Sequence, residues 1–198
     1  MRYVNQKKYP DMPYITCTKP DHPRHERGKT TTIKTSGCGL CSSIMIADRL
    51  LPSYEFELED AIALSYKVGA NYGAGTARLY FDAFAERFGL IKKEASTLEE
   101  LLNCLRTGGA AIVHVGGDRE GRVGLFSHVG HYIVAVNEEP DGRIAILDPA
   151  LEPGRYDEEG RAGKVEVKNG VISVCAPELL HEDTATRQPG SYILFWRK

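Results

Sequence analysis

The hydrophobic residues in the first half of the chain recur with a helical period. Apolar positions in residues 40–51 follow this spacing, and Pro52 ends the helix that they predict. The same spacing predicts three further helices over Glu57–Val68, 77–88 and 98–106. This half of the chain is therefore expected to be mainly helical.

Short polar signals mark the ends of two of these helices. Thr76 can cap the third helix, and Gly89 can end it, because glycine readily adopts the left-handed backbone that closes many helices. Thr97 and Glu100 have the spacing of a capping box for the fourth helix, which the glycine pair at 108–109 ends.

From residue 109 onward the hydrophobic period changes to two, the alternation of a β-strand. A Pro-Asp-Gly turn signal lies within Asn137–Gly142, and the Asn-Gly pair at 169–170 suits a tight hairpin. The six predicted strands cover residues 110–115, 131–136, 143–147, 164–167, 171–174 and 191–196.

Helices followed by antiparallel strands predict an α+β fold. We expect one domain with an extended arm over residues 1–36, a helical part over 37–108 and a sheet part over 109–198. The arm is rich in proline and basic residues, and it is expected to be irregular apart from one short strand near Tyr14–Thr16.

The composition is that of an ordinary globular protein and argues against several classes. The 198 residues are 42% hydrophobic and 26% charged, with a formal net charge of -2. The chain therefore lacks the surplus of basic residues that would indicate binding to nucleic acid or acidic lipid. No apolar run approaches the ~18 residues of a membrane span. Residues 1–14 lack the apolar stretch of a signal peptide, so we expect a cytoplasmic protein.

Cys38 is the most informative of the five cysteines. An odd number of cysteines in a chain of this size does not predict a full disulfide framework, and Cys104 and Cys175 are expected to pack as small hydrophobic residues. Cys38 lies between two glycines at the start of the 40–51 helix. The partial positive charge of a helix N-terminus favours the nucleophilic thiolate, although a buried structural cysteine would also fit this position.

A cysteine nucleophile needs a base and a group that orients the base. Among the six histidines, His131 begins the most apolar strand, where it can reach a helix end that packs on the sheet. Asp148 follows the next strand, and the turn between the two strands returns it to the neighbourhood of His131. This arrangement predicts a carboxylate that fixes the tautomer of an imidazole.

Several motifs together resemble a known family. The segments YVNQ, SGCGLCSS, TLEELLNCLRTGGAAIVHV, VGHYIVAVN and DGRIAILDPA are similar to the bacteriocin-processing branch of the papain-like cysteine peptidases. The resemblance runs from about Tyr3 to Ala150. It implies a papain-like fold, with the nucleophile on a helix N-terminus packed on the antiparallel sheet, and cleavage of a peptide or amide bond.

The resemblance implies a role for four residues by position. Cys38 is the nucleophile, His131 is its base and Asp148 is the orienting carboxylate. Gln6 completes the oxyanion hole, a role for which its own position offers no argument. The resemblance implies no cofactor and no metal. The expected partner is a peptide or amide substrate, and the oligomeric state is left open. The chain carries no transporter region, so we expect a stand-alone soluble relative.

Other functions use the same side chains. Cys38 and Cys41 have the spacing of a thioredoxin-type redox pair, although the preceding stretch is polar. With His128 and His131 they could bind zinc, provided that His128 lies in a loop, because histidines three apart on a strand face opposite sides. An acyltransferase or a non-catalytic peptide-binding module would keep the same residues. Leu40 and Cys41 depart from the family's pattern, which leaves the substrate open.

Overall fold

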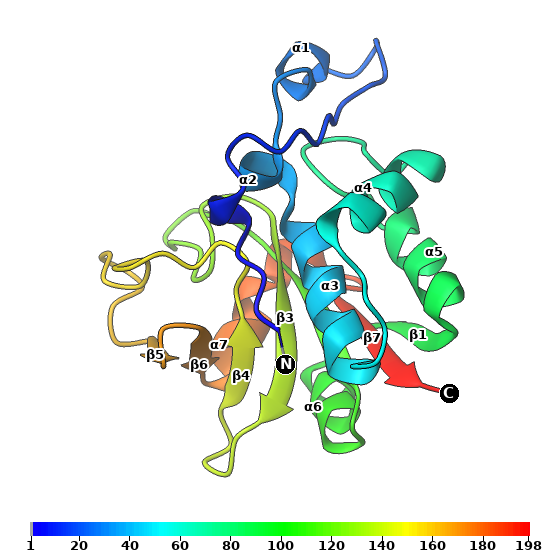
Figure 1. The fold of residues 1–198 in the computed structure, drawn as a ribbon. Helices are drawn as coiled ribbons and strands as arrows, with labels where there is room; N and C mark the ends of the chain where they lie inside the picture. Colours follow the sequence, from blue (N-terminus) through cyan, green and yellow to red (C-terminus); the bar gives the residue numbers. More distant parts are fainter. Residues whose placement is uncertain (1) are drawn as a thin grey trace.

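The computed structural model of the protein describes residues 2–198, and one antiparallel sheet forms its centre (Figure 1). The strands are β1 (Leu90–Ala95), β2 (Ala110–Val115), β3 (His131–Glu138), β4 (Ile144–Leu147), β5 (Val165–Lys168), β6 (Ile172–Cys175) and β7 (Tyr192–Arg197). Their order in the sheet is β1-β7-β2-β3-β4-β6-β5, so the last strand of the chain lies between β1 and β2. β2, β3 and β4 are consecutive antiparallel neighbours, so the start of β3 and the end of β4 lie side by side at the same end of the sheet.

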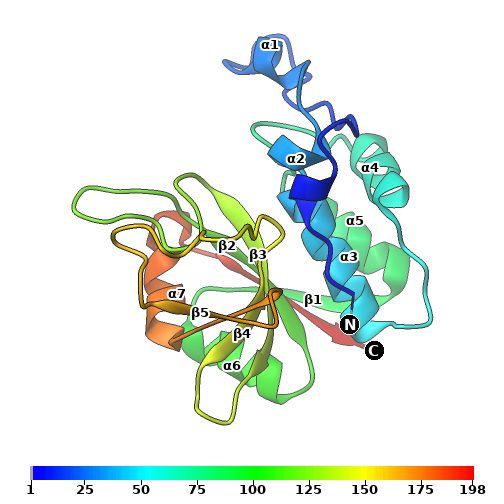
Figure 2. The same cartoon turned by 60° about the vertical axis from the view of Figure 1, so that its left-hand side comes forward.

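Helices cover both faces of this sheet (Figure 2). They are α1 (His25–Gly28), α2 (Ile33–Ser36), α3 (Cys38–Leu50), α4 (Leu58–Lys67), α5 (Leu79–Phe88), α6 (Leu98–Arg106) and α7 (Pro177–Asp183), with short 3-10 turns η1 (Gln6–Lys8) and η2 (Ala185–Arg187). α3, α4 and α5 contribute to the core on one face, whereas α6 and α7 contribute to the core on the other. No helix within residues 2–198 has both the length and the apolar character that crossing a membrane requires.

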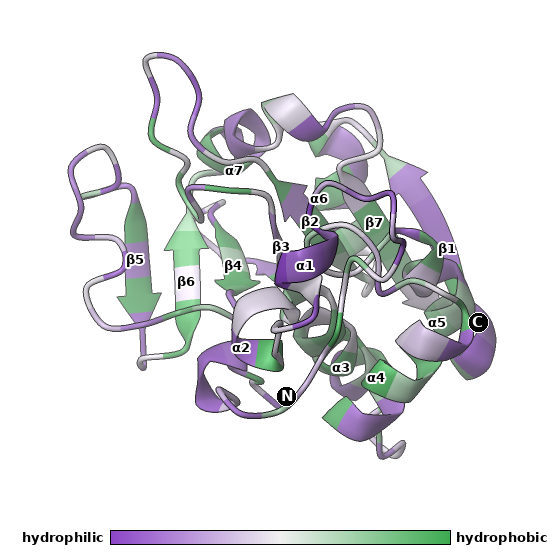
Figure 3. Ribbon diagram, turned by 90° about the horizontal axis from the view of Figure 1, so that it is seen from above, coloured by the Kyte–Doolittle hydropathy of each residue, from purple (hydrophilic) through white to green (hydrophobic). Residues whose placement is uncertain are grey.

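Alternating side chains of the strands supply both cores. In β2, Ile112 belongs to the core that contains α3, and Val113 belongs to the core that contains α6. The hydropathy colouring shows β4 and β6 as mainly hydrophobic and α1 as hydrophilic (Figure 3). Because α3 is buried over residues 39–47, its N-terminus is held firmly against the sheet.

Most of the predicted elements are confirmed, with ends that differ by a few residues. The capping box of α6 forms, since Thr97 accepts a hydrogen bond from the N–H of Glu100 at 3.3 Å. Gly89 ends α5 with a left-handed φ of 62°. Asn169 and Gly170, with φ of 52° and 69°, form the turn between β5 and β6.

The division into a helical part and a sheet part is wrong in detail. β1 lies inside the 37–108 segment and pairs along its length with β7. Half of its residues are charged, because β1 is an edge strand, so its hydrophobic alternation is weak. α7 lies inside the 109–198 segment, and its seven residues are too few to show a helical period.

The N-terminal arm is more ordered than the sequence suggests. Instead of a strand at Tyr14–Thr16, the arm forms one isolated bridge between Pro13 and Thr32. Tyr14 is fully buried, and its hydroxyl lies 3.1 Å from Oγ1 of Thr76. Thr76 therefore does not cap α5, which begins three residues later. The arm packs on the helical layer through these buried polar contacts.

Phe84 ties the helical layer to the sheet, and its truncation tests that packing. Its buried ring contacts Phe56 of the loop before α4 and Phe195 of β7, at centroid distances of 5.8 and 5.7 Å. We expect Phe84→Ala to lower the free energy of unfolding by about 3–5 kcal/mol, measured by urea titration. Ile91→Ala on β1, where Ile91 is 48% exposed, is the control and should cost about 1 kcal/mol or less. Equal losses in both variants would contradict this assignment.

Candidate functional site

Cys38 is the first residue of α3 and is half-buried. The flanking glycines are required by local packing as well as by access. A Cβ on Gly39 would lie 2.8 Å from Cβ of Thr76, and one on Gly37 would lie 2.6 Å from the carbonyl oxygen of Ile33. The chain therefore turns tightly into α3 and leaves the Cys38 side chain at the helix N-terminus, where the backbone N–H groups favour a thiolate.

The start of β3 meets this helix end. Ser42, one turn into α3, donates a hydrogen bond to the carbonyl of Tyr132 at 3.4 Å. Burial alone would raise the pKa of Cys38, but the hydrogen bond and charge of His131 lower it below the ordinary thiol value. The backbone N–H groups of Tyr132 and Gly39 act in the same direction. Cys38 and His131 therefore form a coupled pair.

Asp148 lies behind His131 on the side of β4. Nε2 of His131 is 2.7 Å from Oδ1 of Asp148, so Nδ1 is the ring nitrogen that remains for Cys38. Burial would lower the pKa of His131, but the charge and hydrogen bond of Asp148, together with Cys38, raise it to about 9. Burial would raise the pKa of Asp148, but His131 lowers it to about 2. The lowered pKa of Cys38 and the raised pKa of His131 both favour a thiolate–imidazolium pair, and Asp148 is a carboxylate at neutral pH.

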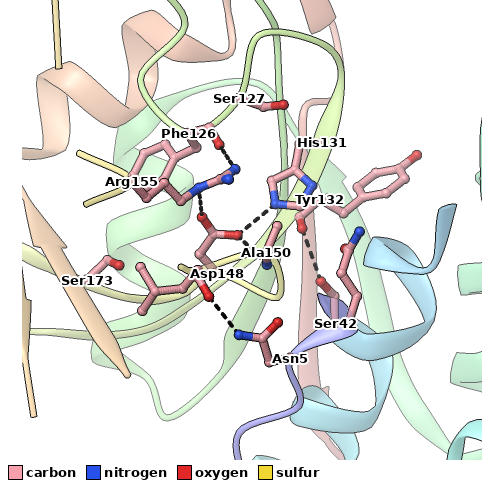
Figure 4. Close-up of polar contacts among 12 residues, drawn as sticks. Asn5, Ser42, Phe126, Ser127, His131, Tyr132, Asp148, Ala150, Arg155 and Ser173 are labelled. Carbon is pink, nitrogen blue, oxygen red and sulfur yellow. Dashed lines mark hydrogen bonds and ion pairs between the residues drawn. The ribbon is translucent and has the colours of Figure 1, made fainter. Parts of the chain in front are cut away.

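Both oxygens of the buried Asp148 carboxylate have two partners. Oδ1 accepts from the backbone N–H of Ala150 at 2.8 Å as well as from His131. Oδ2 accepts from the hydroxyl of Tyr156 at 3.0 Å and lies 2.8 Å from Nε of Arg155 in an ion pair. Figure 4 shows His131 and Arg155 approaching Asp148 from different sides. These contacts leave the carboxylate one orientation and keep it ionised.

Buried charged groups also hold the loop that precedes His131, residues 116–127. Arg155 donates a short hydrogen bond to the carbonyl of Phe126, and Arg161 donates to the carbonyl of Gly124 at 2.7 Å. The Asp183 carboxylate accepts from the N–H groups of residues 125 and 126 at 2.7 and 3.2 Å. The loop is thus fixed by side chains from the C-terminal 48 residues, and Arg155 links it directly to Asp148.

Gln6 is buried, which its sequence position did not indicate. Its Nε2 donates to the carbonyl of Lys34 at 2.8 Å, and its backbone N–H donates to the carbonyl of Pro149 at 2.7 Å. These contacts place Gln6 between the segment that precedes Cys38 and the loop that follows Asp148. One N–H of its amide is used by Lys34, and the second is available to another acceptor.

The other candidate residues lie in different surroundings. Cys41 is fully buried inside α3, and burial raises its pKa, whereas Cys38 is partly exposed with a lowered pKa; both are free thiols. His128 lies in a loop, with Nδ1 2.9 Å from Asp118 and Nε2 3.1 Å from Glu158. In the described part of the chain, no group of three or more His, Cys, Asp or Glu side chains is placed to hold a metal ion.

The fold matches that of two solved proteins. One is the peptidase domain of Streptococcus ComA, a bifunctional ABC transporter involved in a quorum-sensing pathway, with a TM-score of 0.52, 14% identity and coverage of 81% of this chain and 91% of that one. The other, from Bacillus anthracis, is classed as a C39-like peptidase, with a TM-score of 0.51, 12% identity and coverage of 100% and 98%. The fold is that of the papain-like cysteine peptidases. No family model matches the sequence, and a comparison with curated proteins finds no match.

This papain-like structure also contains site residues that sequence reasoning missed. Arg155 and Tyr156 contact Asp148 directly, and the hydroxyl of Tyr3 donates to the backbone carbonyl of Asp148 at 2.7 Å. Tyr3 lies in the YVNQ motif, but no pattern assigned it a contact. Arg155 and Tyr156 lie in a turn-rich stretch with no hydrophobic period, so no local signal identifies them.

The pKa shifts predict the reactivity of Cys38. Since the Cys38 pKa is lowered while the His131 pKa is raised to about 9, the thiolate should form below the ordinary thiol pKa. We expect iodoacetamide to label Cys38 with a midpoint below the ordinary thiol pKa, and to label the four other cysteines more slowly, measured by mass spectrometry across pH. His131→Gln should move the midpoint for Cys38 upward. A midpoint in the ordinary thiol range for the native protein would contradict the coupled pair.

Arg155 provides a second test, because its positive charge keeps Asp148 ionised, and Asp148 in turn stabilises the imidazolium that pairs with Cys38. Arg155→Met should move the acid limb of Cys38 labelling to higher pH by roughly 0.5–1 unit, equivalent to about 1 kcal/mol. Arg161→Met is a matched control, since Arg161 is also buried and binds the same loop without touching Asp148. Equal shifts in the two variants would show that the loop, rather than the charge at Asp148, sets the pH dependence.

Proposed function

We propose that the protein is a cysteine peptidase-like hydrolase that cleaves a peptide or amide bond through a thioester. The observation that carries this proposal is the continuous line of contacts from Cys38 through His131 to Asp148, with a lowered thiol pKa and a raised imidazole pKa. The papain-like fold shared with the ComA peptidase domain and the Bacillus anthracis protein supports it.

In the first step the Cys38 thiolate attacks the carbonyl carbon of the substrate. A C–S bond forms, and the electron pair of the C=O double bond moves to oxygen. The imidazolium of His131 then donates its proton to the leaving amine as the C–N bond breaks. Asp148 keeps the ring in the orientation that this transfer needs and stabilises its positive charge.

Gln6 and the backbone N–H of Cys38 stabilise the oxyanion. The amide of Gln6 is held by Lys34 through one N–H, which leaves the second N–H for the oxyanion. The Cys38 N–H lies in the first turn of α3, where backbone donors have no partner within the helix. A donor of this kind is typically worth about 3 kcal/mol in the transition state.

In the second step a water molecule attacks the thioester. Neutral His131 accepts a proton from the water, the C–S bond breaks, and the acid product leaves with Cys38 regenerated. The same side chains would serve an acyltransferase, in which an amine takes the place of water. Hydrolysis is the form we propose, because both solved proteins compared above are described as peptidases.

The proposal is tested by cleavage of a proteome-derived peptide library, with products read by mass spectrometry. We expect Cys38→Ala to abolish cleavage and Asp148→Asn to leave a weak residual rate. Gln6→Ala should lower kcat by about 100-fold, because one oxyanion donor is lost while the Cys38 thiolate is retained. Full turnover by Cys38→Ala would refute the mechanism. An unchanged kcat in Gln6→Ala would remove Gln6 alone from it.

A further inference from the structure

Arg187, at the end of η2, carries a charge that no carboxylate compensates. Within residues 2–198, the arginines without a carboxylate at ion-pair distance are Arg24, Arg27, Arg49, Arg187 and Arg197. Four of them are exposed to solvent, whereas Arg187 is partly buried, and its Nε has no hydrogen-bond partner. A partly buried cation without a counter-charge is costly, and an anionic ligand would remove that cost.

Arg187 lies against the residue that precedes the proposed base in the chain. Its guanidinium packs against Gly130, the residue before His131, so closely that a Cβ on Gly130 would fall 2.9 Å from Cζ of Arg187. A side chain at position 130 would therefore displace the guanidinium from its present position. The arginine therefore lies at the start of β3, at the same end of the sheet as His131.

Other unpartnered polar atoms gather around Arg187. Of the seven buried side-chain polar atoms that lack a hydrogen-bond partner in the described chain, four belong to His114, Arg187, Gln188 and Ser191. His114 and Ser191 are adjacent, since the N–H of His114 donates to the Ser191 carbonyl at 2.8 Å. More than half of these buried polar atoms without a hydrogen-bond partner are therefore in residues at this end of the sheet.

The net charge of this region is positive. Arg78 is the second arginine here, but it pairs with Glu94 at 3.2 Å. Burial, with the charges of Arg187 and Arg78, lowers the pKa of His114 to about 3, so His114 is neutral at physiological pH. Two other acidic groups lie near His131: Asp148 is occupied by its own partners behind the imidazole, and Cys38 is paired with the imidazole itself. Arg187 therefore supplies one uncompensated positive charge.

The charge of Arg187 acts on His114, and contacts lead from His114 toward the thiol. The ring of His114 packs on the ring of Tyr132, with centroids 4.4 Å apart. The backbone N–H of Tyr132 hydrogen-bonds Cys38. The Tyr132 ring points away from Asp148 in Figure 4, toward the other side of His131. We call Arg187, Gly130, His114 and Tyr132 the Arg187 subsite.

We propose that the Arg187 subsite binds a carboxylate of the peptide substrate, either an acidic side chain near the scissile bond or a C-terminal carboxylate. The planar guanidinium can hold a carboxylate through two parallel hydrogen bonds. Partial burial strengthens this attraction relative to an exposed arginine. This inference rests on the proposed peptidase function and adds a preference for an acidic residue to it.

The first experiment compares two alkylating reagents at Cys38, iodoacetate and iodoacetamide, which differ in one negative charge. The ratio of their rates cancels the intrinsic reactivity of the thiol. We expect Arg187→Gln to lower the iodoacetate-to-iodoacetamide ratio by roughly 3- to 10-fold, because the local positive charge is lost. Arg49→Gln, which removes an exposed arginine from the far end of α3, is the matched control and should leave the ratio unchanged.

The second experiment uses the proteome-derived peptide library with native protein, Arg187→Gln and Arg187→Glu. The native protein should prefer Asp or Glu at one position relative to the cut, Arg187→Gln should lose that preference, and Arg187→Glu should favour Lys or Arg. A library with amidated C-termini separates the two sources of carboxylate: a preference that survives amidation belongs to a side chain.

The outcomes separate this inference from the proposed function. Cleavage without acidic preference, or an unchanged reagent ratio in Arg187→Gln, overturns the Arg187 subsite and leaves the peptidase proposal standing. No cleavage of any peptide, together with a Cys38 that labels no faster than an ordinary thiol, overturns the peptidase proposal itself and the substrate role of Arg187 with it.

Discussion

Asp148 holds a negative charge with no exposure to solvent, and the arrangement of the site depends on how that charge is compensated. A buried carboxylate without partners would cost several kcal/mol, and removal of one partner from a buried pair typically costs about 3–5 kcal/mol. Here His131, Ala150, Arg155 and Tyr156 occupy its two oxygens. The imidazole is therefore held by an acceptor that cannot itself turn.

The loop that begins with Asp148 and Pro149 also holds the N-terminal arm in place. Tyr3 donates to the backbone carbonyl of Asp148, and the N–H of Gln6 donates to the carbonyl of Pro149, both at 2.7 Å. Since the arm has little regular structure of its own, these contacts determine where Gln6 lies. The compensation of one buried charge and the placement of the proposed oxyanion donor are thus parts of one local structure.

Two arginines beside His131 have opposite electrostatic situations. Arg155 lies behind Asp148, and its charge is matched by that carboxylate. Arg187 lies against Gly130 on the other side, and its charge is unmatched within the described residues. The first stabilises the proposed catalytic groups in their charged forms. Arg187 is free to interact with a ligand. The proposed catalysis and the proposed substrate recognition therefore depend on different arginines.

Local sequence signals were sufficient for much of the fold and for part of the candidate site. Helical spacing and a capping box predicted α3 and α6, and an Asn-Gly turn predicted the β5–β6 hairpin, because each depends on residues close together in the chain. Cys38, His131 and Asp148 were identified because each lies at the end of such an element. β1 was missed, since an edge strand with charged residues shows little alternation.

What only the tertiary structure decided is the environment of those ends. Gln6 was named by resemblance alone, and its burial comes from contacts with residues 28 and 143 positions away. Arg155 and Arg187 belong to segments without a hydrophobic period, and no sequence pattern distinguishes a compensated arginine from an uncompensated one. The sequence by itself determined the helices and the hairpin, because these follow from local backbone preferences. It also indicated Cys38, His131 and Asp148, because each lies at an end of such an element. The partners of each charge depend on which distant segments of the chain come together when the sheet and its covering helices assemble.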